Sequence, residues 1–323
     1  MLTPGSNLWI DLTSLLRRAA PCAFLPRTAL CIIAFQEERC LDEWLRYHLY
    51  LGFDHVFIYD NAPQPILQEF AEKYPGFVTV IHFPGRNQQS NAYDHFATIA
   101  RGSFTWGACI DGDEFIVLRR HASIGALLDE HCRHGALGLN WLLFGSNSQL
   151  HYSPEPVLQR FTRREATVAP RVKSIGRLAD VRKWVHPHYP ALKRGTLHDT
   201  NGLVFHETSR NPQGDDRIAV VHHYRIKSRD EFVEKMNRGP VDHKFNTPDE
   251  FIRDDKNDVE DTRAWDFYRA QPPFEAWLAA KTPYRFKLRP ATKPPTFWRE
   301  LERKIRHGVK RLWGRMASWL AMA

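Results

Sequence analysis

Short apolar runs alternate with segments of helical spacing over the first third of the chain. The run TALCIIAF is typical of a strand that is buried on both faces of a sheet, and HVFIYDN and FVTVIHF predict a second and a third strand. Between the first two, EERCLDEWLRYHLYLG repeats its apolar residues at helical spacing, and Gly52 stands where such a helix would end. Strands that alternate with helices predict an α/β fold, in which helices flank both faces of a mainly parallel, Rossmann-like sheet.

A fourth apolar run, WGACIDGDEFIVL, contains three acids among its buried positions. Buried carboxylates are costly, so a metal ion or a basic side chain should lie against them. Asp111 and Asp113 are two residues apart at a strand end and should point the same way, as a pair that shares a hard cation does. Oxygen ligands favour Mg²⁺ or Mn²⁺, and an ion pair with an arginine is the alternative. Glu114 should point the opposite way and have a supporting role.

Polar residues follow each of the four predicted strands. Ligands of parallel sheets bind beyond the carboxyl ends of the strands, so these residues should gather at one site, although loops are polar in most proteins. The four polar segments are Gln36–Glu38, Asp60–Asn61, Arg86–Gln89 and Asp111–Asp113.

The alternation weakens after the acidic run. ALGLNWLLFGSN and VVHHYRI predict further strands, and a capping box of Ser228 and Glu231 should begin the helix that follows the second. Residues 153–216 are rich in Pro, Arg and His and predict an irregular half that covers the site. We therefore divide the chain into an extension (1–27), one domain (28–289) with a nucleotide-sugar-binding half (28–118) and an acceptor-side half (119–289), and a basic C-terminal helix (290–323).

Composition indicates a globular protein: 43% of the 323 residues are apolar and 25% are charged. No apolar run approaches the ~20 residues of a membrane span, the N-terminus lacks the order of a secretory signal, and the five cysteines are scattered. These features predict a cytoplasmic protein. The net charge of +8 is concentrated in the last 28 residues, whose amphipathic pattern predicts an interfacial helix on an anionic membrane. A helix packed on its own domain or on a partner subunit is the alternative.

The ordered motifs resemble glycosyltransferases of the GT-A fold, in the group related to families 2 and 92. The resemblance covers roughly residues 28–241 and rests on the strand-end phrase W-x-x-x-I-D-x-D-E-F, on EERCLDEWLRYHLYLGFDHVFIYDN, and on WLLFGSN, RVKSI and HHYRIKSRDEFVEKMNRG. It implies transfer of a sugar from a nucleotide-diphosphate sugar, with a UDP-sugar favoured, to a glycan, lipid-linked or lipopolysaccharide-type acceptor. It leans toward inversion, and no nucleic-acid motif is present.

The resemblance implies roles for residues at the strand ends. Glu37 lies where the family has Lys-Asn-Glu, but Phe35 and Gln36 replace the lysine and asparagine, which puts donor contacts there in doubt. Asp60 would contact the nucleoside, or it caps the following turn. Asp111 and Asp113 would hold Mn²⁺ or Mg²⁺ and, through it, the diphosphate.

Other candidates lie farther along the chain. His223, in a His-Tyr pair, would be a further metal ligand, with His186 and His188 competing for that role and a core histidine as the alternative. Lys235 and Arg238, with Lys227, would neutralise the leaving diphosphate, or they form a solvated basic face.

The catalytic base of an inverting reaction is the least defined residue, and Glu155 and Asp242 are the candidates. Asp242 follows Arg238-Gly239 as in the family's Arg-Gly-x-x-Asp pattern. Two other functions compete with sugar transfer. Paired aspartates also serve metal-dependent phosphohydrolases, and the altered first-strand end is compatible with an inactive nucleotide-sugar-binding homologue.

Overall fold

The computed structural model describes residues 27–132, 134–206, 208–239 and 247–289. The predicted C-terminal helix, and the extension apart from residue 27, lie outside these ranges. The elements in chain order are β1 (Thr28–Ala34), α2 (Glu38–Tyr50), β2 (His55–Asp60), α3 (Gln68–Lys73), β3 (Val78–His82), α4 (Gln89–Ala100), β4 (Trp106–Cys109), β5 (Glu114–Leu118), α5 (Ile124–His131), β6 (Gly135–Leu143), α6 (Val157–Arg160), β7 (Arg163–Arg164), β8 (Ala169–Arg177), β9 (Val181–His186), β10 (Tyr189–Leu192), β11 (Thr196–His198), β12 (Ala219–His223), α7 (Arg229–Asn237), α8 (Pro248–Asp254), β13 (Val259–Glu260), α9 (Arg263–Arg269) and α10 (Phe274–Ala280).

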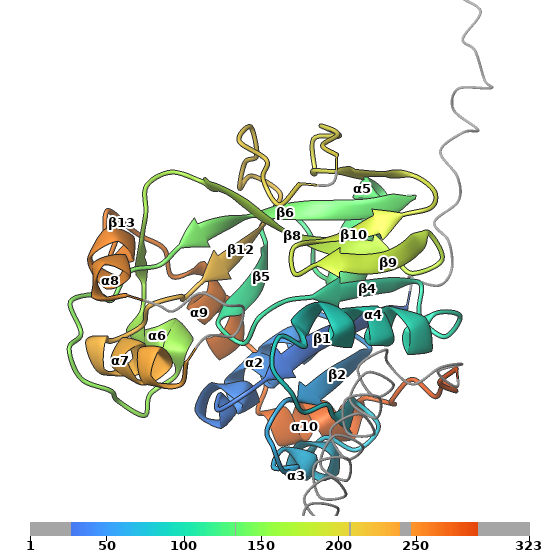
Figure 1. Ribbon diagram of the computed structural model, residues 1–323, viewed down its shortest axis with the longest axis horizontal. Helices are drawn as coiled ribbons and strands as arrows, with labels where there is room; N and C mark the ends of the chain where they lie inside the picture. Colours follow the sequence, from blue (N-terminus) through green and yellow to red (C-terminus); the bar gives the residue numbers. More distant parts are fainter. Residues whose placement is uncertain (1–26, 133, 207, 240–246, 290–323) are drawn as a thin grey trace, which may run out of the picture.

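One nine-stranded sheet organises the molecule (Figure 1). Its order is β3-β2-β1-β4-β8-β6-β12-β5, and β11 also pairs with β6. The pairs among β3, β2, β1 and β4 are parallel, as are β6 with β12 and with β11. β8 runs antiparallel to both of its neighbours, and β5 runs antiparallel to β12. The predicted α/β class, with a mostly parallel sheet flanked by helices, is confirmed.

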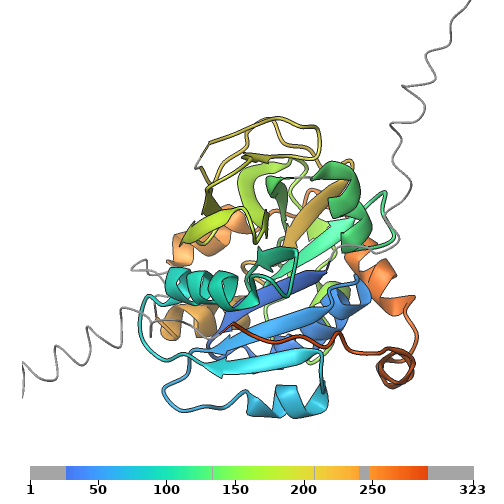
Figure 2. The ribbon, with the colours of Figure 1, turned by 90° about the vertical axis from the view of Figure 1, so that its right-hand side faces the viewer.

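Helices cover both faces of the first strands (Figure 2), and β1 alternates between the two apolar layers. Ala29 and Cys31 belong to the cluster that contains Phe96 of α4, whereas Leu30 belongs to the cluster that contains Trp44 of α2. Because both faces of β1 are buried, its sequence is continuously apolar. The α2 helix ends before Gly52, whose φ of 100° is a conformation that glycine adopts without steric cost.

The acidic run forms two strands rather than one. β4 ends at Cys109, a tight turn carries the aspartates, and β5 begins at Glu114. The Trp44 indole donates hydrogen bonds to the carbonyls of Asp111 (3.1 Å) and Glu114 (2.8 Å), which fixes this turn against α2. The reversal lets β5 leave β4 and pair with β12 at the far edge of the sheet.

The segment predicted as an irregular cover contributes a central strand. β8 lies between β4 and β6 in the sheet, and the β9–β10 hairpin follows it. The nucleotide-binding and acceptor-side halves that we predicted therefore share one sheet. None of the helices within the described ranges has the length and apolarity that a membrane crossing requires.

Candidate active site

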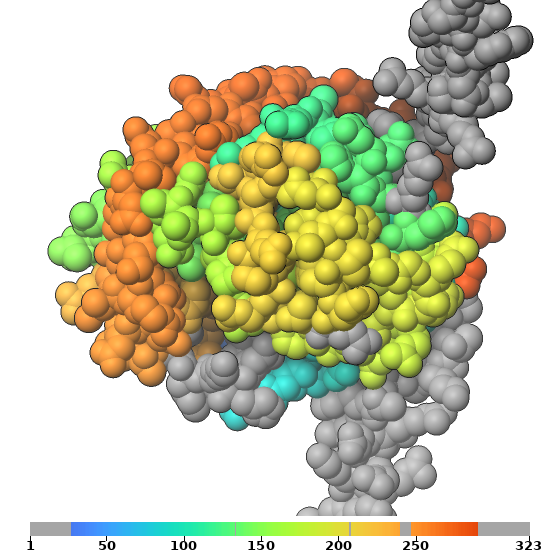
Figure 3. Space-filling model, turned by 90° about the horizontal axis from the view of Figure 1, so that it is seen from above, coloured from blue at the N-terminus to red at the C-terminus, as the bar shows by residue number. Residues whose placement is uncertain are grey.

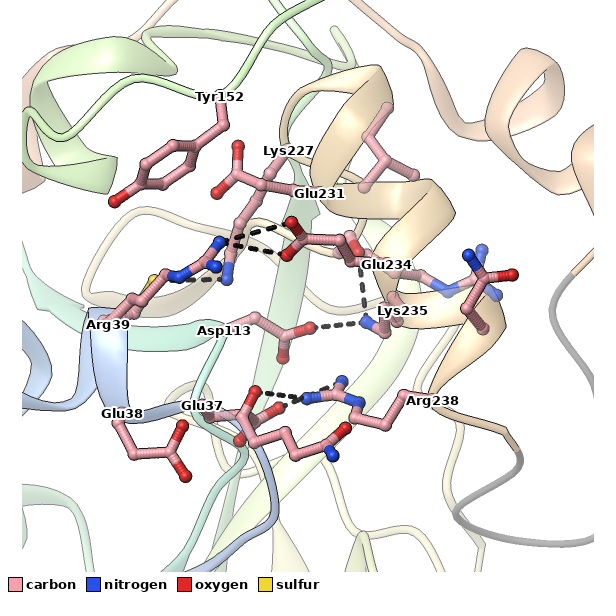
Figure 4. Close-up of a pocket in the computed structure, with 15 residues that line it drawn as sticks. Glu37, Glu38, Arg39, Asp113, Tyr152, Lys227, Glu231, Glu234, Lys235 and Arg238 are labelled. Carbon is pink, nitrogen blue, oxygen red and sulfur yellow. Dashed lines mark hydrogen bonds and ion pairs between the residues drawn. The ribbon is translucent and has the colours of Figure 1, made fainter.

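The carboxyl ends of the parallel strands open onto a cavity of about 550 Å³ (Figure 4). α2 begins directly after β1 and α7 follows β12, so both helices contribute side chains to it. Acidic and basic groups alternate in its lining, together with one aromatic ring. The lining comprises Gln36, Glu37, Glu38, Arg39, Cys40, Asp113, Tyr152, Arg225, Ile226, Lys227, Glu231, Glu234, Lys235, Asn237 and Arg238.

Asp111 is held ionised by side chains from two elements. Gln89 Nε2 (2.7 Å) and Tyr93 Oη (3.1 Å), both on α4, donate to its Oδ1, and Lys173 Nζ of β8 donates to its Oδ2 at 2.9 Å. Burial alone would raise the pKa of Asp111, but Lys173 outweighs this effect and the pKa lies below its usual value. The side chain keeps 36% of its surface exposed, so it remains accessible to a ligand.

Asp113 has a different set of partners. Lys235 Nζ of α7 donates to Oδ2 at 2.8 Å, and His223 Nε2 lies 3.4 Å from Oδ1. Burial would raise the pKa of Asp113, but Lys235 and His223 hold it well below its ordinary range. Both aspartates are therefore anionic at neutral pH, as a cation site requires.

Glu114 begins β5 and supports the turn that carries the pair. It is fully buried, its Oε2 accepts a hydrogen bond from the Asp111 amide (2.9 Å), and Lys173 Nζ lies 3.3 Å from that oxygen. Oε1 has no hydrogen-bond partner, and burial raises the pKa of this carboxyl well above its usual value.

The basic groups that we expected against the three acids are lysines. Lys173 reaches Asp111 and Glu114, and Lys235 reaches Asp113. Lys235 was among the predicted residues, but Lys173 was not assigned a role, although it lies within the quoted motif RVKSI. The buried acids could have indicated Lys173, because buried carboxylates without a partner require a cation nearby.

The α7 helix brings its basic side chains to the end of β1. Its capping box is formed as predicted, with Ser228 accepting from the Glu231 amide and Glu231 accepting from the Ser228 amide. Arg238 donates to the carbonyls of Phe35 (2.8 Å) and Gln36 (3.0 Å), and its Nη2 lies 3.4 Å from Glu37 Oε1. Burial raises the pKa of Glu37.

Lys227 precedes this helix in a left-handed conformation with a φ of 54°. Its Nζ contacts Cys40 Sγ at 3.5 Å, and no carboxylate of the described ranges forms an ion pair with it. Burial would lower the pKa of Lys227, but Cys40 and the nearby Asp113 raise it above its usual value. It is therefore a cation that faces the cavity without a carboxylate bound to it (Figure 4).

Asp60 makes the turn-capping contacts of our alternative interpretation. Its carboxylate is fully buried and accepts from the amides of Ala62 (3.1 Å), Ile66 (2.7 Å) and Leu67 (3.0 Å). These bonds order the loop that leads to α3, and the nucleoside contact stays a prediction.

Glu155, the candidate base that the structure describes, contacts neither Asp111 nor Asp113. Glu155 is exposed, accepts a hydrogen bond from Ser153, and borders a separate hollow beside Tyr152. Asp242 lies outside the described residues. Of the competing histidines, His188 contacts the Val172 carbonyl through its Nδ1 at 2.7 Å, and burial lowers the pKa of its imidazole to about 3 although Asp111 acts to raise it.

The predicted metal ligands suit a hard cation by chemistry but are not gathered around one point. Among the described residues, the group of three His, Cys, Asp or Glu side chains whose ligand atoms lie within 4.8 Å of one another is His121, Glu130 and His131. Asp111 and Asp113 instead turn toward separate lysines. A shared cation would require the half-buried Lys235 to move off Asp113.

The sheet, and the ionised side chains at the carboxyl ends of its parallel strands, place the chain among Rossmann-like α/β proteins. It belongs to glycosyltransferase family 92, whose sequence profile matches residues 28–263. Family 92 proteins from Ricinus communis and Arabidopsis thaliana are 28% and 26% identical to it over 218 and 230 residues. These alignments cover 64% and 65% of this chain but 36% and 37% of the relatives, so the chain spans well under half of their length.

A third family 92 protein, from Oryza sativa subsp. japonica, is 32% identical over 90 residues, or 27% of this chain and 15% of the relative. Among solved structures, 4-diphosphocytidyl-2C-methyl-D-erythritol synthase from Anaerococcus prevotii aligns with a TM-score of 0.25 and 11% identity. That alignment covers 79% of this chain and 100% of the synthase.

Proposed function

We propose that the chain is a glycosyltransferase that moves a sugar from a nucleotide-diphosphate donor, with a UDP-sugar favoured, to a glycan or lipid-linked acceptor. One observation carries the proposal: two ionised aspartates and several basic side chains meet at the carboxyl ends of parallel strands, beside a cavity of about 550 Å³. Family membership gives the reaction class. The phosphates supply the negative charge that such a set of cations would bind.

Asp111 and Asp113 would hold Mn²⁺ or Mg²⁺, with His223 as a further candidate ligand. Both carboxylates are ionised and their oxygens suit a hard ion. When bound, such an ion neutralises charge on the diphosphate. Lys235 would then leave Asp113 for a phosphate oxygen, a short movement for a lysine whose side chain is 24% exposed.

The chain's own cations would bind the leaving nucleoside diphosphate. Lys227 and Lys235 line the cavity close to Asp113, and Arg238 reaches across it to Glu37 (Figure 4). Charge that develops on the departing phosphate as the sugar–oxygen bond breaks would be stabilised by these groups. The acceptor hydroxyl must lose its proton in an inverting reaction, and Asp242 and Glu155 remain the candidate bases.

The acceptor is the part of the proposal that depends on the C-terminal segment. Residues 296–323 carry the basic amphipathic pattern of an interfacial helix, which would bring the site to the inner face of a membrane and to a lipid-linked or envelope-glycan acceptor. Pelleting with anionic vesicles, compared between the full chain and a chain that ends at residue 295, tests this step. Equal pelleting of the two chains would contradict it.

The reaction is tested on chelator-treated full-length protein supplied with UDP-sugars, an acceptor mixture and graded Mn²⁺. Asp111→Asn and Asp113→Asn should each lower transfer about a hundredfold or more, because each removes a charge that positions the diphosphate. Asp129→Asn, which removes an exposed acid on α5, is the matched control and should keep full activity. Circular dichroism verifies that the variants fold.

The other outcomes of this experiment separate the competing functions. Release of phosphate without an acceptor would favour a phosphohydrolase, and a donor-induced thermal shift without turnover would favour an inactive homologue. Full transfer in the chelated sample would show that Lys173 and Lys235 alone balance the charges of Asp111 and Asp113. It would contradict the proposed metal ion.

A further inference from the structure

A second group of ligand-type side chains lies at the end of β5 remote from Asp113. His121 follows β5 in the turn that leads to α5, and Glu130 and His131 end that helix. One ligand atom of each lies within 4.8 Å of the other two. The cavity that we assign to the donor includes none of these three residues.

The separations within this group match those of ligands on one ion. His121 Nε2 lies 2.9 Å from Glu130 Oε2, and His131 Nε2 lies 3.6 Å from Glu130 Oε1. Ligand atoms of a tetrahedral zinc, at about 2.0–2.2 Å from the metal, are about 3.3–3.6 Å apart. Small side-chain adjustments would therefore place the two imidazole nitrogens and a carboxylate oxygen around one ion.

The His121 ring is held at this position although its hydrogen bonding is incomplete. Its side chain is 8% exposed, and its Nδ1 is buried without a hydrogen-bond partner. A buried polar atom without a partner costs about 1–3 kcal/mol. A metal bond at Nε2 would leave Nδ1 as it is, so the positions of the three ligand atoms, and not this unpartnered nitrogen, carry the case for an ion.

His131 has the second contact that orients a metal-binding histidine. It hydrogen-bonds with the backbone of Thr200, while its Nε2 is on the side of Glu130. Such bonds to backbone groups commonly fix the tautomer and the ring plane of a metal-binding histidine. The two rings meet edge to face, with centroids 5.2 Å apart.

The same residues also form an ordinary hydrogen-bonded cluster when no ion is bound. The Glu130 side chain is 67% exposed, and the positive charge of Arg120 acts on the same carboxylate. That positive charge would repel a metal ion bound there. Two features favour a metal over this alternative: both histidines direct Nε2 to the two oxygens of one carboxylate, and the exposed side leaves a position for water.

We propose that His121, Glu130 and His131 bind a divalent transition-metal ion such as Zn²⁺, at a site separate from the donor cavity. Imidazole and carboxylate ligands suit Zn²⁺, Co²⁺ or Ni²⁺ better than the Mg²⁺ and Mn²⁺ of an all-oxygen site. The ion would be structural. It would join the turn after the edge strand β5 to the end of α5.

The bound ion would also lie close to the neighbouring strand β11. His198 Nε2 of this strand contacts the His131 carbonyl at 3.0 Å, so α5 and β11 meet where the ion would bind. In Figure 3 the green surface that includes α5 lies beside the yellow surface of the segment that follows β11. Binding should therefore raise the melting temperature without a requirement for the donor.

The test uses the chelator-treated full chain, titrated with Zn²⁺ by calorimetry and followed by thermal shift. We expect one bound ion and a raised melting temperature. Glu130→Gln should weaken binding at least about tenfold, as loss of a ligand should cost no less than loss of a group that orients one. Asp129→Asn removes the same charge from the adjacent exposed position and should bind like wild type.

Two further variants distinguish this site from the donor cavity and from a change in folding. Asp111→Asn should bind Zn²⁺ as wild type does, and His131→Gln should lose the visible absorption of bound Co²⁺ while its circular dichroism is unchanged. Equal Zn²⁺ binding by Glu130→Gln and Asp129→Asn would overturn the proposal. So would binding that is lost in Asp111→Asn and retained in Glu130→Gln.

Discussion

The strands β1 to β3 and the strands β6, β8 and β12 lie in one sheet but bury different chemistry. In the first group the fully buried polar residues occupy strand ends: Thr28 and His55 begin their strands, and Asp60 ends β2. In the second group they lie within or at the site end of the strands, as Asn140, Lys173, Ser174, His222 and His223 do.

This difference shows that the first strands form the framework of the site, whereas the later strands supply the basic side chains that balance its acids. The first strands present their acids at the tips, where the backbone turns. The later strands carry Lys173 and His223 to Asp111 and Asp113, which lie in the turn between β4 and β5, and α7 adds Lys235 from the side. The charge balance of the site therefore depends on residues that are more than 60 positions away from the aspartates in the chain.

Replacement of Lys173 by methionine is the strongest test of this dependence within the fold. Lys173→Met would leave Asp111 and Glu114 without their shared cation, and loss of one partner of a buried ion pair costs about 3–5 kcal/mol. Urea unfolding should show a lower midpoint with an unchanged slope. Lys183→Met, at an exposed position of β9, is the matched control and should change stability by less than about 0.5 kcal/mol.

A second substitution tests the cause of this effect. Adding Glu114→Gln to Lys173→Met should recover part of the lost stability, because it removes one of the two carboxyls that the lysine contacts. A double variant as unstable as the sum of the single variants would show that Lys173 acts through packing. The two groups of strands would then differ in how their side chains pack and not in the charges that they supply to the site.

The first group of strands could be predicted from the sequence because its signals are local. Continuous apolar runs identified β1 and β2, helical spacing identified α2, and the capping box placed the start of α7 at Ser228. Asp111 and Asp113 could be singled out because acids in an apolar run are conspicuous. These patterns need no knowledge of distant residues.

Among the later strands, β6 and β12 were predicted from their apolar runs, but β8 was assigned to an irregular half because its partners are distant in sequence. β8 contains Arg171, Lys173 and Ser174, so it lacks the apolar run of β1, yet Lys173 is satisfied by Asp111 and Ser174 by the His188 carbonyl. The split of the acidic run into β4 and β5 was missed for the same reason. β5 pairs with β12, more than 100 residues later, and no local pattern specifies that pairing.

Three buried histidines make the stability depend on pH: His55 in the first group of strands, His222 in the second, and His48 on α2. Burial lowers the pKa of His48 to about 3, that of His55 to about 4 and that of His222 to about 3. Below pH 6.5 the unfolded chain takes up protons at these positions and the folded chain does not, so stability falls as the pH falls toward these values. Each histidine should cost about 1.2 kcal/mol between pH 7.0 and 5.5.

Urea unfolding at the two pH values measures the total loss, and the imidazole ¹⁵N resonances assign it. The signals of His48, His55 and His222 should remain those of neutral rings at pH 5.5. Buried carboxyls such as Glu43, whose pKa burial raises, act in the opposite direction near the acidic end of the range. If His222 alone titrated between pH 5.5 and 7.0, then Asp261 would stabilise the protonated ring more than burial and the nearby arginines oppose it. The second group of strands would then contain a protonatable histidine in its core, and the first group would not.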